Sequence, residues 1–306
     1  PPASGNHVRF IVGLRAQLCT VVRDRLPIAV HFHSSKAGFA GRFVLAMLKE
    51  RPACYYSPHG LSFLNGRRLI ASGLYYALEK AAGLVHHTPV GCGKSEAVLL
   101  ERLTRRAAFI LENPVCEDLF ALHRAETSPP TVISIGRACE QKAPERFTEL
   151  SLKFQIDEST VQFVWVGSGE TAREDLLKAA CVKVTGWVGS DEVKQWLSAA
   201  SVYVQTSRWE GMPLSVLQAM AAGLPCVVTD VVGNKDAIRH GETGFIAKND
   251  DEILGYVRLL LADDALRKQL GMAARLDAQQ RFGPEPFRRS LRRLYQLSPL
   301  EISQQT

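Results

Sequence analysis

The stretch from Ser207 to Phe245 constrains the fold of this 306-residue chain more than any other. It predicts, in order, a loop, a helix, a buried strand and a glycine turn. Pro213 suits a first helical turn, where its missing N–H costs nothing, and Gly223 suits the left-handed position that ends a helix. Residues 226–228 (Cys-Val-Val) are apolar without alternation, as is typical of a strand in a parallel sheet covered on both faces. The stretch therefore predicts part of a parallel α/β domain.

Strand and helix patterns alternate along the whole chain in two series, separated by a polar segment with two prolines at residues 124–130. Such alternation is typical of parallel α/β folds. We expect two Rossmann-like α/β domains facing a cleft, at residues 1–125 and 126–282, followed by a basic terminal helix within residues 283–306. The first domain lacks a recognisable opening strand and glycine-rich turn, and the chain starts without Met, which we interpret as a fragment.

Composition narrows the possible classes of protein. Hydrophobic residues make up 46% of the chain, and no apolar run is long enough to predict a membrane-spanning helix or a signal peptide. The seven cysteines are dispersed without a Cys-x-x-Cys pair, which favours free thiols in a reducing compartment over disulfides or a zinc site. We therefore expect a cytoplasmic protein.

Charge is distributed unevenly. Residues 1–125 contain 16 Lys and Arg against 8 Asp and Glu, a net +8, whereas the remainder is slightly acidic. This predicts an anionic partner surface, but no basic-aromatic array accompanies it, so nucleic acid is not expected as a partner. An amphipathic helix at 67–82, with Arg67 and Arg68 at its start, predicts peripheral contact with an anionic membrane on the inner face of the plasma membrane. The alternative is that this helix buries its apolar side on the sheet.

The loop before the helix in the 207–245 stretch has the chemistry of a ligand site. Gly211 allows close backbone approach, and the backbone N–H groups at the following helix start form an anion site. Glu210 and Gln218 are eight residues apart, about two helical turns, so both can reach one ligand. The alternative is a solvated carboxylate and a surface glutamine. The candidate ligand-binding residues at this helix start are Gly211, Met212, Pro213, Leu214 and Ser215.

Two further strand ends are candidates in the second domain. The strand at 131–136 ends at Gly136, followed by Arg137 and Lys142, whose cationic groups can stabilise the charge growing on a leaving diphosphate. A solvated basic loop is the alternative. The strand at 161–166 ends in a turn at Gly167, but Gly-Ser-Gly is too short for a dinucleotide fingerprint, so we exclude NAD.

In the first domain, the strand at 28–33 leads through a glycine-bearing turn into a helix, a geometry that presents backbone N–H groups to a ligand or simply packs a helix tightly on a sheet. A second strand ends at His59, where ligands bind in open α/β sheets, although a lone histidine can also be structural. The candidate ligand-binding residues of this domain are His59, Ser35, Lys36 and Gly38, with Asn113 further along.

The 207–245 stretch resembles the donor-binding signature of retaining glycosyltransferases of family four, which have the GT-B fold. Their pattern is Glu, seven residues, Glu, then Ala-Met-Ala-x-Gly-x-Pro-x-Val. Here Glu210 and the tail AMAAGLPCVV match, whereas Gln218 replaces the second Glu. The resemblance implies that Glu210 contacts the transferred sugar and that residue 218 holds the ribose. Glutamine can still hydrogen-bond a diol, but without the charge assistance of a carboxylate.

Other segments extend the resemblance. Gly136-Arg137 and Lys142 are similar to the pair that neutralises the donor diphosphate, and His59 occupies a strand-end position like that of the family's sugar-facing histidine. Asn113 stands where the family has Asn-Gly-(Ile/Val)-Asp, with the Gly and the Asp lost. The segment HSSKAG resembles polysaccharide-building members, and the terminal helix is implied to return to the first domain. The resemblance thus implies that the candidate residues of the first domain, His59, Ser35, Lys36, Gly38 and Asn113, lie on the acceptor side.

Together these features predict a retaining glycosyltransferase of the hexosyltransferase type. It would move a sugar from a nucleotide-sugar donor to a glycan or lipid-linked acceptor in surface polysaccharide or lipopolysaccharide biosynthesis. No Asp-x-Asp motif is present, so we expect no metal, and no cofactor besides the donor substrate. Two alternatives remain open: a GT-B sugar-nucleotide epimerase, and a non-catalytic subunit that binds a nucleotide sugar.

Overall fold

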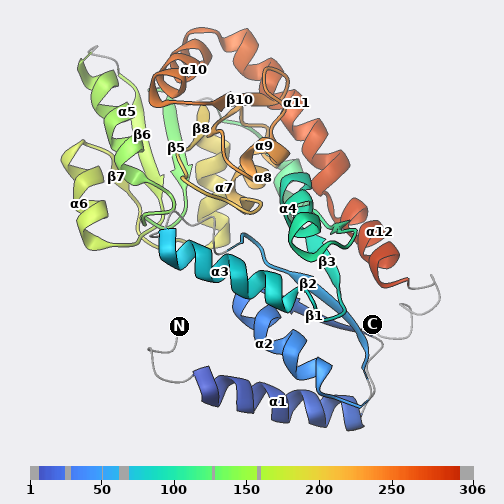
Figure 1. The fold of residues 1–306 in the computed structure, drawn as a ribbon. Helices are drawn as coiled ribbons and strands as arrows, with labels where there is room; N and C mark the ends of the chain where they lie inside the picture. Colours follow the sequence, from blue (N-terminus) through green and yellow to red (C-terminus); the bar gives the residue numbers. More distant parts are fainter. Residues whose placement is uncertain are drawn as a thin grey trace. The chain divides into compact units, whose positions relative to one another are not determined.

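The protein forms two compact units in the computed structural model: residues 1–111 with 290–306, and residues 112–289 (Figure 1). The structure describes residues 7–24, 29–49, 51–61, 69–125, 128–156 and 160–296. The elements that begin in the first unit are α1 (His7–Asp24), β1 (Ala29–His33), α2 (Ser35–Ala46), β2 (Ala53–Ser57), α3 (Leu69–Ala82), β3 (Thr88–Gly91), α4 (Lys94–Thr104) and β4 (Phe109–Ile110). Those that begin in the second are η2 (Glu117–Ala121), β5 (Thr131–Ile135), α5 (Pro144–Ile156), β6 (Gln162–Val166), α6 (Thr171–Ala179), β7 (Lys183–Val184), α7 (Ser190–Ala199), β8 (Val202–Gln205), α8 (Leu214–Ala221), β9 (Cys226–Thr229), α9 (Asn234–Ala237), β10 (Gly244–Ala247), α10 (Asp250–Ala262), α11 (Asp264–Phe282) and α12 (Pro284–Tyr295).

The sheet of the first unit is parallel, in the order β1-β2-β3-β4. Helix α2 lies between α1 and α3 (Figure 1). Alternate residues of each strand point to opposite faces, so Phe32 and Tyr56 point toward the helices and pack with Leu45, Leu61 and Leu100. These side chains form the main core of the first unit.

The opposite face of the same sheet has a smaller core. Tyr55 and Val90 pack there with Leu294, and Tyr295 lies at its edge. Residues 290–296, the end of α12, therefore belong to the first unit, where they cover the strand face that carries His31.

The second unit has a six-stranded parallel sheet in the order β10-β9-β8-β5-β6-β7. From β5 the chain moves outward through β6 and β7, then returns to β8 and continues in the other direction. The strand order therefore reverses between β5 and β8, and in open α/β sheets ligands bind at the carboxyl ends of the strands at such a reversal. This topology fixes where a ligand site is expected in this unit.

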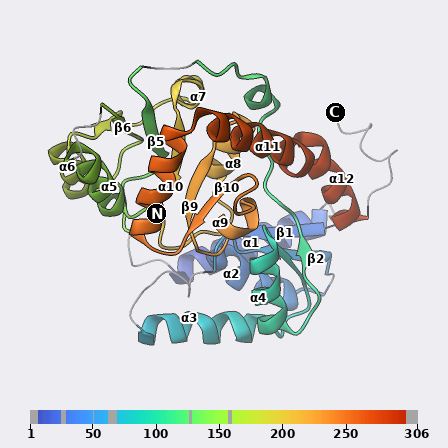
Figure 2. The same cartoon turned by 90° about the horizontal axis from the view of Figure 1, so that it is seen from above.

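Helix α8 is buried against the sheet and packs along α11 (Figure 2). It ends as predicted, because Gly223 has a φ of 75° and its N–H and that of Leu224 bond back to the last turn. Pro225 then leads directly into β9, whose residues are all buried. The sheet and α8 thus hold the loop that precedes the helix in one place.

The predicted fold class, two parallel α/β domains, is confirmed. Several bounds differ from the sequence patterns: the apolar runs at 107–115 and 182–188 contribute only the two-residue strands β4 and β7. The first unit ends at Leu111, whereas the predicted boundary was residue 125. The reason is that 112–125 bonds to the second unit, through Val115 N to Phe282 O and Ala125 N to Ser198 O.

The predicted helix at 67–82 is described from Leu69 onward, so Arg67 and Arg68 lie outside the described residues. Among the helices that are described, none combines the length and the apolar composition that crossing a membrane requires.

Candidate active site

The loops that follow β5 and β8 meet at the point where the strand order of the second sheet reverses. Arg208 N donates to Gln141 O at 2.8 Å, and Thr206 Oγ1 donates to Lys142 O at 2.8 Å. Two segments nearly 70 residues apart in sequence are thereby held side by side. The pairing brings the predicted residues Lys142 and Glu210 together.

Glu210 is the centre of this arrangement. Its side chain is only 7% exposed, and Lys142 Nζ lies 2.7 Å from its Oε1. The same oxygen accepts hydrogen bonds from Ser207 Oγ at 2.7 Å and Gln205 Nε2 at 3.0 Å, while Oε2 accepts one from Gln141 Nε2 at 3.3 Å. A buried carboxylate needs such partners, because an unpaired charge in this environment is costly. The network fixes the carboxylate in one orientation.

Sequence analysis missed Gln205, Ser207 and Gln141 as partners of Glu210. Two of them lie within five residues of Glu210, so their polar side chains at the end of an otherwise apolar strand were an available signal. Gln141 comes from the β5 loop, and only the meeting of the two loops reveals its role.

The glycine turns at the ends of β5 and β6 pack closely. Gly167 has a φ of 138°, and a Cβ added there would lie 2.2 Å from Gly136 O. The chain therefore requires glycine at 167 for backbone contact, independently of any ligand. Arg137, directly after Gly136, is exposed and makes no hydrogen bond or ion pair with any residue the structure describes. A guanidinium in this position is available to an anion from solvent.

The start of α8 has open backbone donors. No side chain caps it, and Pro213 O already accepts from Val216 and Leu217 N, which leaves the N–H groups of Leu214 and Ser215 without a helical partner. Gln218 lies half-buried within the helix. An uncapped helix start beside a cationic loop is suited to a phosphate group.

Asn113 has a different place from the one expected. It was predicted on the acceptor side of the first domain, but it belongs to the second unit, and its Nδ2 donates to Met212 O at 3.3 Å. It therefore supports the loop at the start of α8. The signal was not local, because the contact spans 99 residues of sequence.

The strand ends of the first unit bring three histidines together. His31 and His33 alternate on β1, so they share a face, and their rings stack with centroids 4.2 Å apart. His33 Nδ1 lies 2.8 Å from Nε2 of the predicted residue His59, which follows β2. His31 bonds Tyr295 Oη at 2.6 Å and Ser57 Oγ at 2.9 Å. Sequence analysis named only His59, although the spacing of two residues in His-Phe-His was a signal for a shared face.

Burial lowers the pKa of His31 to about 4, and the neighbouring His33 and His59 lower it further in the same direction. Burial and the charge of His59 also lower the pKa of His33. Both rings are therefore neutral at neutral pH, which is the state in which imidazoles can accept as well as donate hydrogen bonds.

The turn from β1 into α2 contains the other predicted acceptor-side residues. Ser34 caps the helix by accepting from Ala37 N at 3.5 Å, while Ser35 and Lys36 form the first turn. Gly38 has a packing role, since a Cβ there would lie 2.0 Å from the ring of Tyr56. Of this group, Lys36 is the exposed cation.

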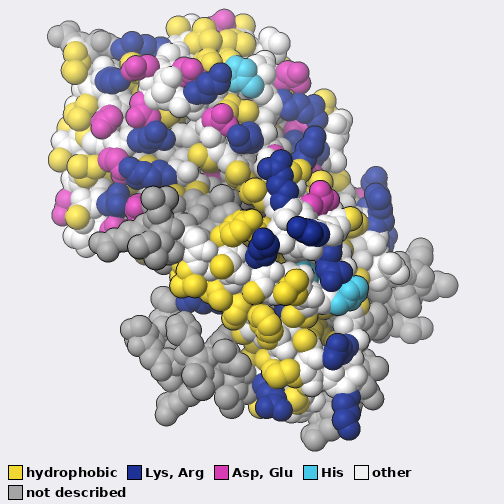
Figure 3. All heavy atoms as spheres, in the orientation of Figure 1, with side chains coloured by type: hydrophobic (Ala, Val, Ile, Leu, Met, Phe, Trp, Pro, Cys, Tyr) yellow, Lys and Arg dark blue, Asp and Glu magenta, His cyan; other side chains and the backbone are white. Residues whose placement is uncertain are grey.

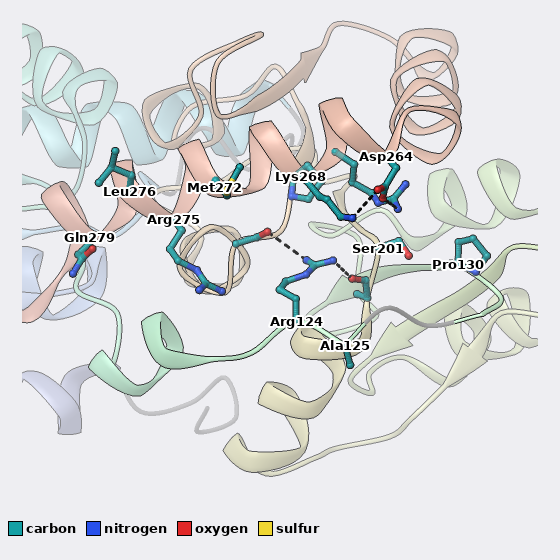
Figure 4. Close-up of a pocket in the computed structure, with 14 residues that line it drawn as sticks. Arg124, Ala125, Pro130, Ser201, Asp264, Lys268, Met272, Arg275, Leu276 and Gln279 are labelled. Atoms are coloured by element: carbon teal, nitrogen blue, oxygen red, sulfur yellow. Dashed lines mark hydrogen bonds and ion pairs between the residues drawn. The ribbon is translucent and has the colours of Figure 1, made fainter.

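A cavity of about 610 Å³ lies elsewhere in the second unit, between α11 and the amino ends of β5, β8 and β9 (Figure 4). Arg124 and Arg275 point into it and bond the carbonyls of Gly223 and Ala222 at the end of α8. Because the β5 and β8 loops described above lie at the carboxyl ends of the strands, this cavity is separate from them. Arg124 and Arg275 serve the carboxyl end of α8, where cations stabilise the helix dipole.

Within the described part of the chain, no group of three or more His, Cys, Asp or Glu side chains is arranged to hold a metal ion.

Comparison with known proteins places this geometry in context. Residues 129–263 match the family model described as "Glycosyl transferases group 1". A curated relative from Escherichia coli, UDP-Gal:alpha-D-GlcNAc-diphosphoundecaprenol alpha-1,3-galactosyltransferase, is 28% identical over 72% of this chain and 62% of its own length. Another from Campylobacter jejuni, N,N'-diacetylbacillosaminyl-diphospho-undecaprenol alpha-1,3-N-acetylgalactosaminyltransferase, is 31% identical over 49% of this chain and 40% of its own. The chain thus spans less than two thirds of the length of these relatives.

Solved structures share the fold. Sucrose-phosphate synthase from Thermosynechococcus elongatus superposes with a TM-score of 0.84 at 18% identity, covering 97% of this chain and 79% of that one. HepE from Anabaena, solved in complex with UDP, gives a TM-score of 0.75 at 15% identity, covering 93% and 82%. The solved structures show that the fold is GT-B, and the family model and the relatives support the glycosyl transferases group 1 family for the part of the chain that they match.

Proposed function

We propose that this protein is a retaining, metal-independent glycosyltransferase. It transfers a sugar from a nucleotide-sugar donor to a glycan or lipid-linked acceptor in surface polysaccharide biosynthesis. The observation that carries the proposal is the Lys142–Glu210 pair at the strand reversal. Exposed Arg137 precedes Lys142 in the loop after β5, and the uncapped start of α8 follows Glu210. Both curated relatives named above are transferases by name, and their names contain a diphosphoundecaprenol-linked sugar, so they do not favour the epimerase or the non-catalytic subunit.

The proposed donor chemistry follows from the charges. A lysine ammonium has three N–H donors, and the bond to Glu210 uses one, so two remain for a donor phosphate. Arg137 adds a guanidinium that can bind two phosphate oxygens at once. As the bond to the sugar breaks, negative charge grows on the nucleoside diphosphate, and these two cations stabilise it more than they stabilise the bound substrate. In this proposal they do the work of a divalent metal, and no resident cofactor takes part.

The remaining roles are proposed by the same logic. Glu210, fixed by its four partners, holds the hydroxyls of the transferred sugar, and Gln218 holds the ribose. His59, with Ser35 and Lys36 nearby in the first unit, lines the acceptor side. Asn113 supports the α8 loop through Met212 O.

The test is an assay of the full chain with a panel of nucleotide sugars, with and without a lipid-diphosphate-linked sugar acceptor, in the presence of EDTA. Transfer that needs the acceptor and survives EDTA supports the proposal, and NMR of the product reports whether the anomeric configuration is retained. Turnover of the donor into an epimer without acceptor would favour the epimerase. Binding of UDP without turnover of any donor would favour the non-catalytic subunit.

We also propose that the first unit attaches peripherally to an anionic membrane. Hydrophobic side chains gather on its surface over α2 and α3 (Figure 3). Met47, directly after α2, and Leu74 of α3 are 63% and 60% exposed. Exposed Lys36 and Lys80 belong to the same two helices. Apolar groups that enter the headgroup layer together with lysines, each contributing about 1 kcal/mol, suit a lipid-linked acceptor.

Liposome flotation tests the attachment. The protein should float with anionic vesicles at low salt, and added salt should reduce the bound fraction. Leu74→Glu should release it, whereas Leu176→Glu, an equally apolar exposed site on α6 of the second unit, should not. Equal recovery with neutral and anionic vesicles would contradict the proposal.

A further inference from the structure

The side chain of His59 is held by a hydrogen bond to a second histidine, His33. His33 Nδ1 and His59 Nε2 lie 2.8 Å apart, and the two rings are nearly parallel, with an interplanar angle of 16° and centroids 5.1 Å apart. His33 is stacked in turn on His31, which is anchored on both ring nitrogens by Tyr295 and Ser57. His31 therefore fixes the orientation of the His33 ring, and His33 fixes the orientation of the exposed ring of His59.

The backbone of His59 is held in an unusual conformation. Its φ is 53°, in the left-handed region, which non-glycine residues adopt infrequently. The next residue, Gly60, donates its N–H to Glu96 Oε1 at 2.7 Å, and Glu96 is buried, with its other oxygen accepting from Cys92 N at 2.8 Å. A strained residue persists only where its surroundings determine it, and such residues cluster at functional sites. Glu96 therefore fixes the loop through the backbone N–H of Gly60, while the side chain of His59 remains exposed.

We propose that His33 is a positioning residue for His59: the His33 Nδ1–His59 Nε2 bond and the ring stack hold His59 in one rotamer, with Nδ1 directed to a hydroxyl of the sugar acceptor. This inference rests on the proposed function and deepens it, by assigning the atom of His59 that meets the acceptor. A neutral imidazole has one donor and one acceptor nitrogen. Because Nε2 is used by His33, Nδ1 is the nitrogen left for a ligand, and no residue in the described ranges bonds to it.

A sugar hydroxyl is the partner that suits this arrangement. It can donate to and accept from an imidazole nitrogen, so it fits whichever tautomer the pair selects. An imidazole free to rotate would present either nitrogen, and the bound state would have to select one, which weakens binding. Locking the ring through His33 removes that loss before the acceptor arrives.

Three substitutions separate the hydrogen bond from the ring stack. His33→Asn places an amide near the position of Nδ1 and keeps the bond, whereas His33→Gln places its amide further out and loses it. His33→Phe keeps a stacked ring without any nitrogen. Because His33 is exposed at a strand end, we expect all three to fold, and the thermal unfolding of each full-length variant is measured first.

The first readout is independent of activity. Long-range ¹H–¹⁵N correlation spectra of the histidine rings report the hydrogen bonding of each ring nitrogen. In the wild-type protein and in His33→Asn, Nε2 of His59 should show the shift of a nitrogen bonded within the protein. In His33→Gln and His33→Phe that shift should move to the value of a nitrogen exposed to solvent. Identical His59 ring shifts in all four proteins would overturn the proposal, whether or not any transfer is detected.

The second readout compares KM for the acceptor with KM for the donor. Loss of the bond should raise KM for the acceptor about tenfold, the size of effect expected from one hydrogen bond, and leave KM for the donor unchanged. His33→Asn should restore most of the loss. If the wild-type protein transfers sugar and His33→Gln has the same acceptor KM, the positioning role fails while the proposed function stands. If no transfer is detected in the wild type, the proposed function fails, and the ring spectra still decide the role of His33.

Discussion

The candidate sites of the two units are built in opposite ways. In the second unit, a buried carboxylate and a lysine form an ion pair, and every partner of Glu210 comes from the end of β8 or from the loops that follow β5 and β8. In the first unit, the exposed side chains at the strand ends are the imidazoles of His33 and His59. Charged groups lie in the interior of that unit: Arg42 and Glu79 pair in the core, and Glu96 holds the loop at Gly60.

This difference in charge indicates which kind of ligand each site can recognise. Fixed charges with open backbone donors suit a diphosphate, whose charge does not vary between substrates. Neutral imidazoles held at a set orientation suit hydroxyl groups, which are both donors and acceptors. The proposed function needs both kinds of site, one for an anionic donor and one for a carbohydrate acceptor.

The largest expected effect concerns the buried pair of the first unit. Arg42 is fully buried, with Nη2 2.9 Å from Glu79 Oε2 and its guanidinium 4.0 Å from the centroid of the Tyr56 ring. Arg42→Ala leaves Glu79 buried without its cation, so we expect a loss of about 3–5 kcal/mol in the free energy of unfolding, measured by urea denaturation. If the units are separate in function, UDP binding by calorimetry should change less than twofold.

The control for that prediction is the double substitution Arg42→Met with Glu79→Leu, which removes both charges and should regain most of the stability. A tenfold loss of UDP affinity in Arg42→Ala would show that the two sites are coupled, and the contrast between the units would no longer hold.

The second largest expected effect concerns the two cations of the second unit, Lys142 and Arg137. We expect Lys142→Ala and Arg137→Ala each to lower kcat/KM by about a hundredfold or more, equivalent to roughly 3 kcal/mol, with a smaller loss of UDP affinity, because the cations act most strongly on the charge of the transition state. Lys153→Ala, which removes an exposed lysine paired with Asp251 in the same unit, is the matched control and should leave both constants unchanged. Unchanged kinetics in Lys142→Ala and Arg137→Ala would remove the phosphate assignment.

A third effect tests the neutral state of the histidine cluster. The pKa of His31 is lowered to about 4 in the folded protein from its ordinary 6.5, so the unfolded chain binds more protons between these values. Stability due to this group is therefore complete above pH 6.5 and is lost as the pH falls toward 4. We expect roughly 1–2 kcal/mol, allowing for solvent screening of the partly exposed ring.

Unfolding free energies of the wild type and His31→Asn at pH 7 and pH 5 measure this term. His87, whose pKa is also lowered to about 4 by burial, titrates in both proteins and cancels in the comparison. The pH dependence should be smaller in His31→Asn. The same slope in both proteins would mean that another group carries it.

The smallest effect concerns residue 218. We expect Gln218→Glu to keep or improve donor affinity, because a carboxylate accepts hydrogen bonds from a ribose diol more strongly than an amide does. Gln195→Glu adds the same charge at an exposed position on α7 and controls for the change in net charge. A loss of about tenfold or more, roughly 1.4 kcal/mol, in Gln218→Glu alone would indicate a site adapted to the neutral amide.

Local patterns in the sequence determined the class of fold and the positions of its charged loops. A few neighbouring residues determine each of three features: the continuously apolar strands, the end of the helix at Gly223, and the alternation of strands and helices. These features can therefore be predicted without knowledge of the rest of the chain. The same holds for Lys142 and Glu210, because a strand that ends in a parallel sheet delivers the next residues to its carboxyl edge.

Only the tertiary structure decided which of these residues meet. The Lys142–Glu210 pair, the contact of Asn113 with Met212 and the His33–His59 bond each join segments 26 to 99 residues apart, and they depend on strand order and register. Register also determined that β4 and β7 are two residues long, since a strand extends only as far as its neighbour offers hydrogen bonds. The physical reason is that a local pattern fixes the conformation of a segment, whereas a site is made by the long-range pairing of segments.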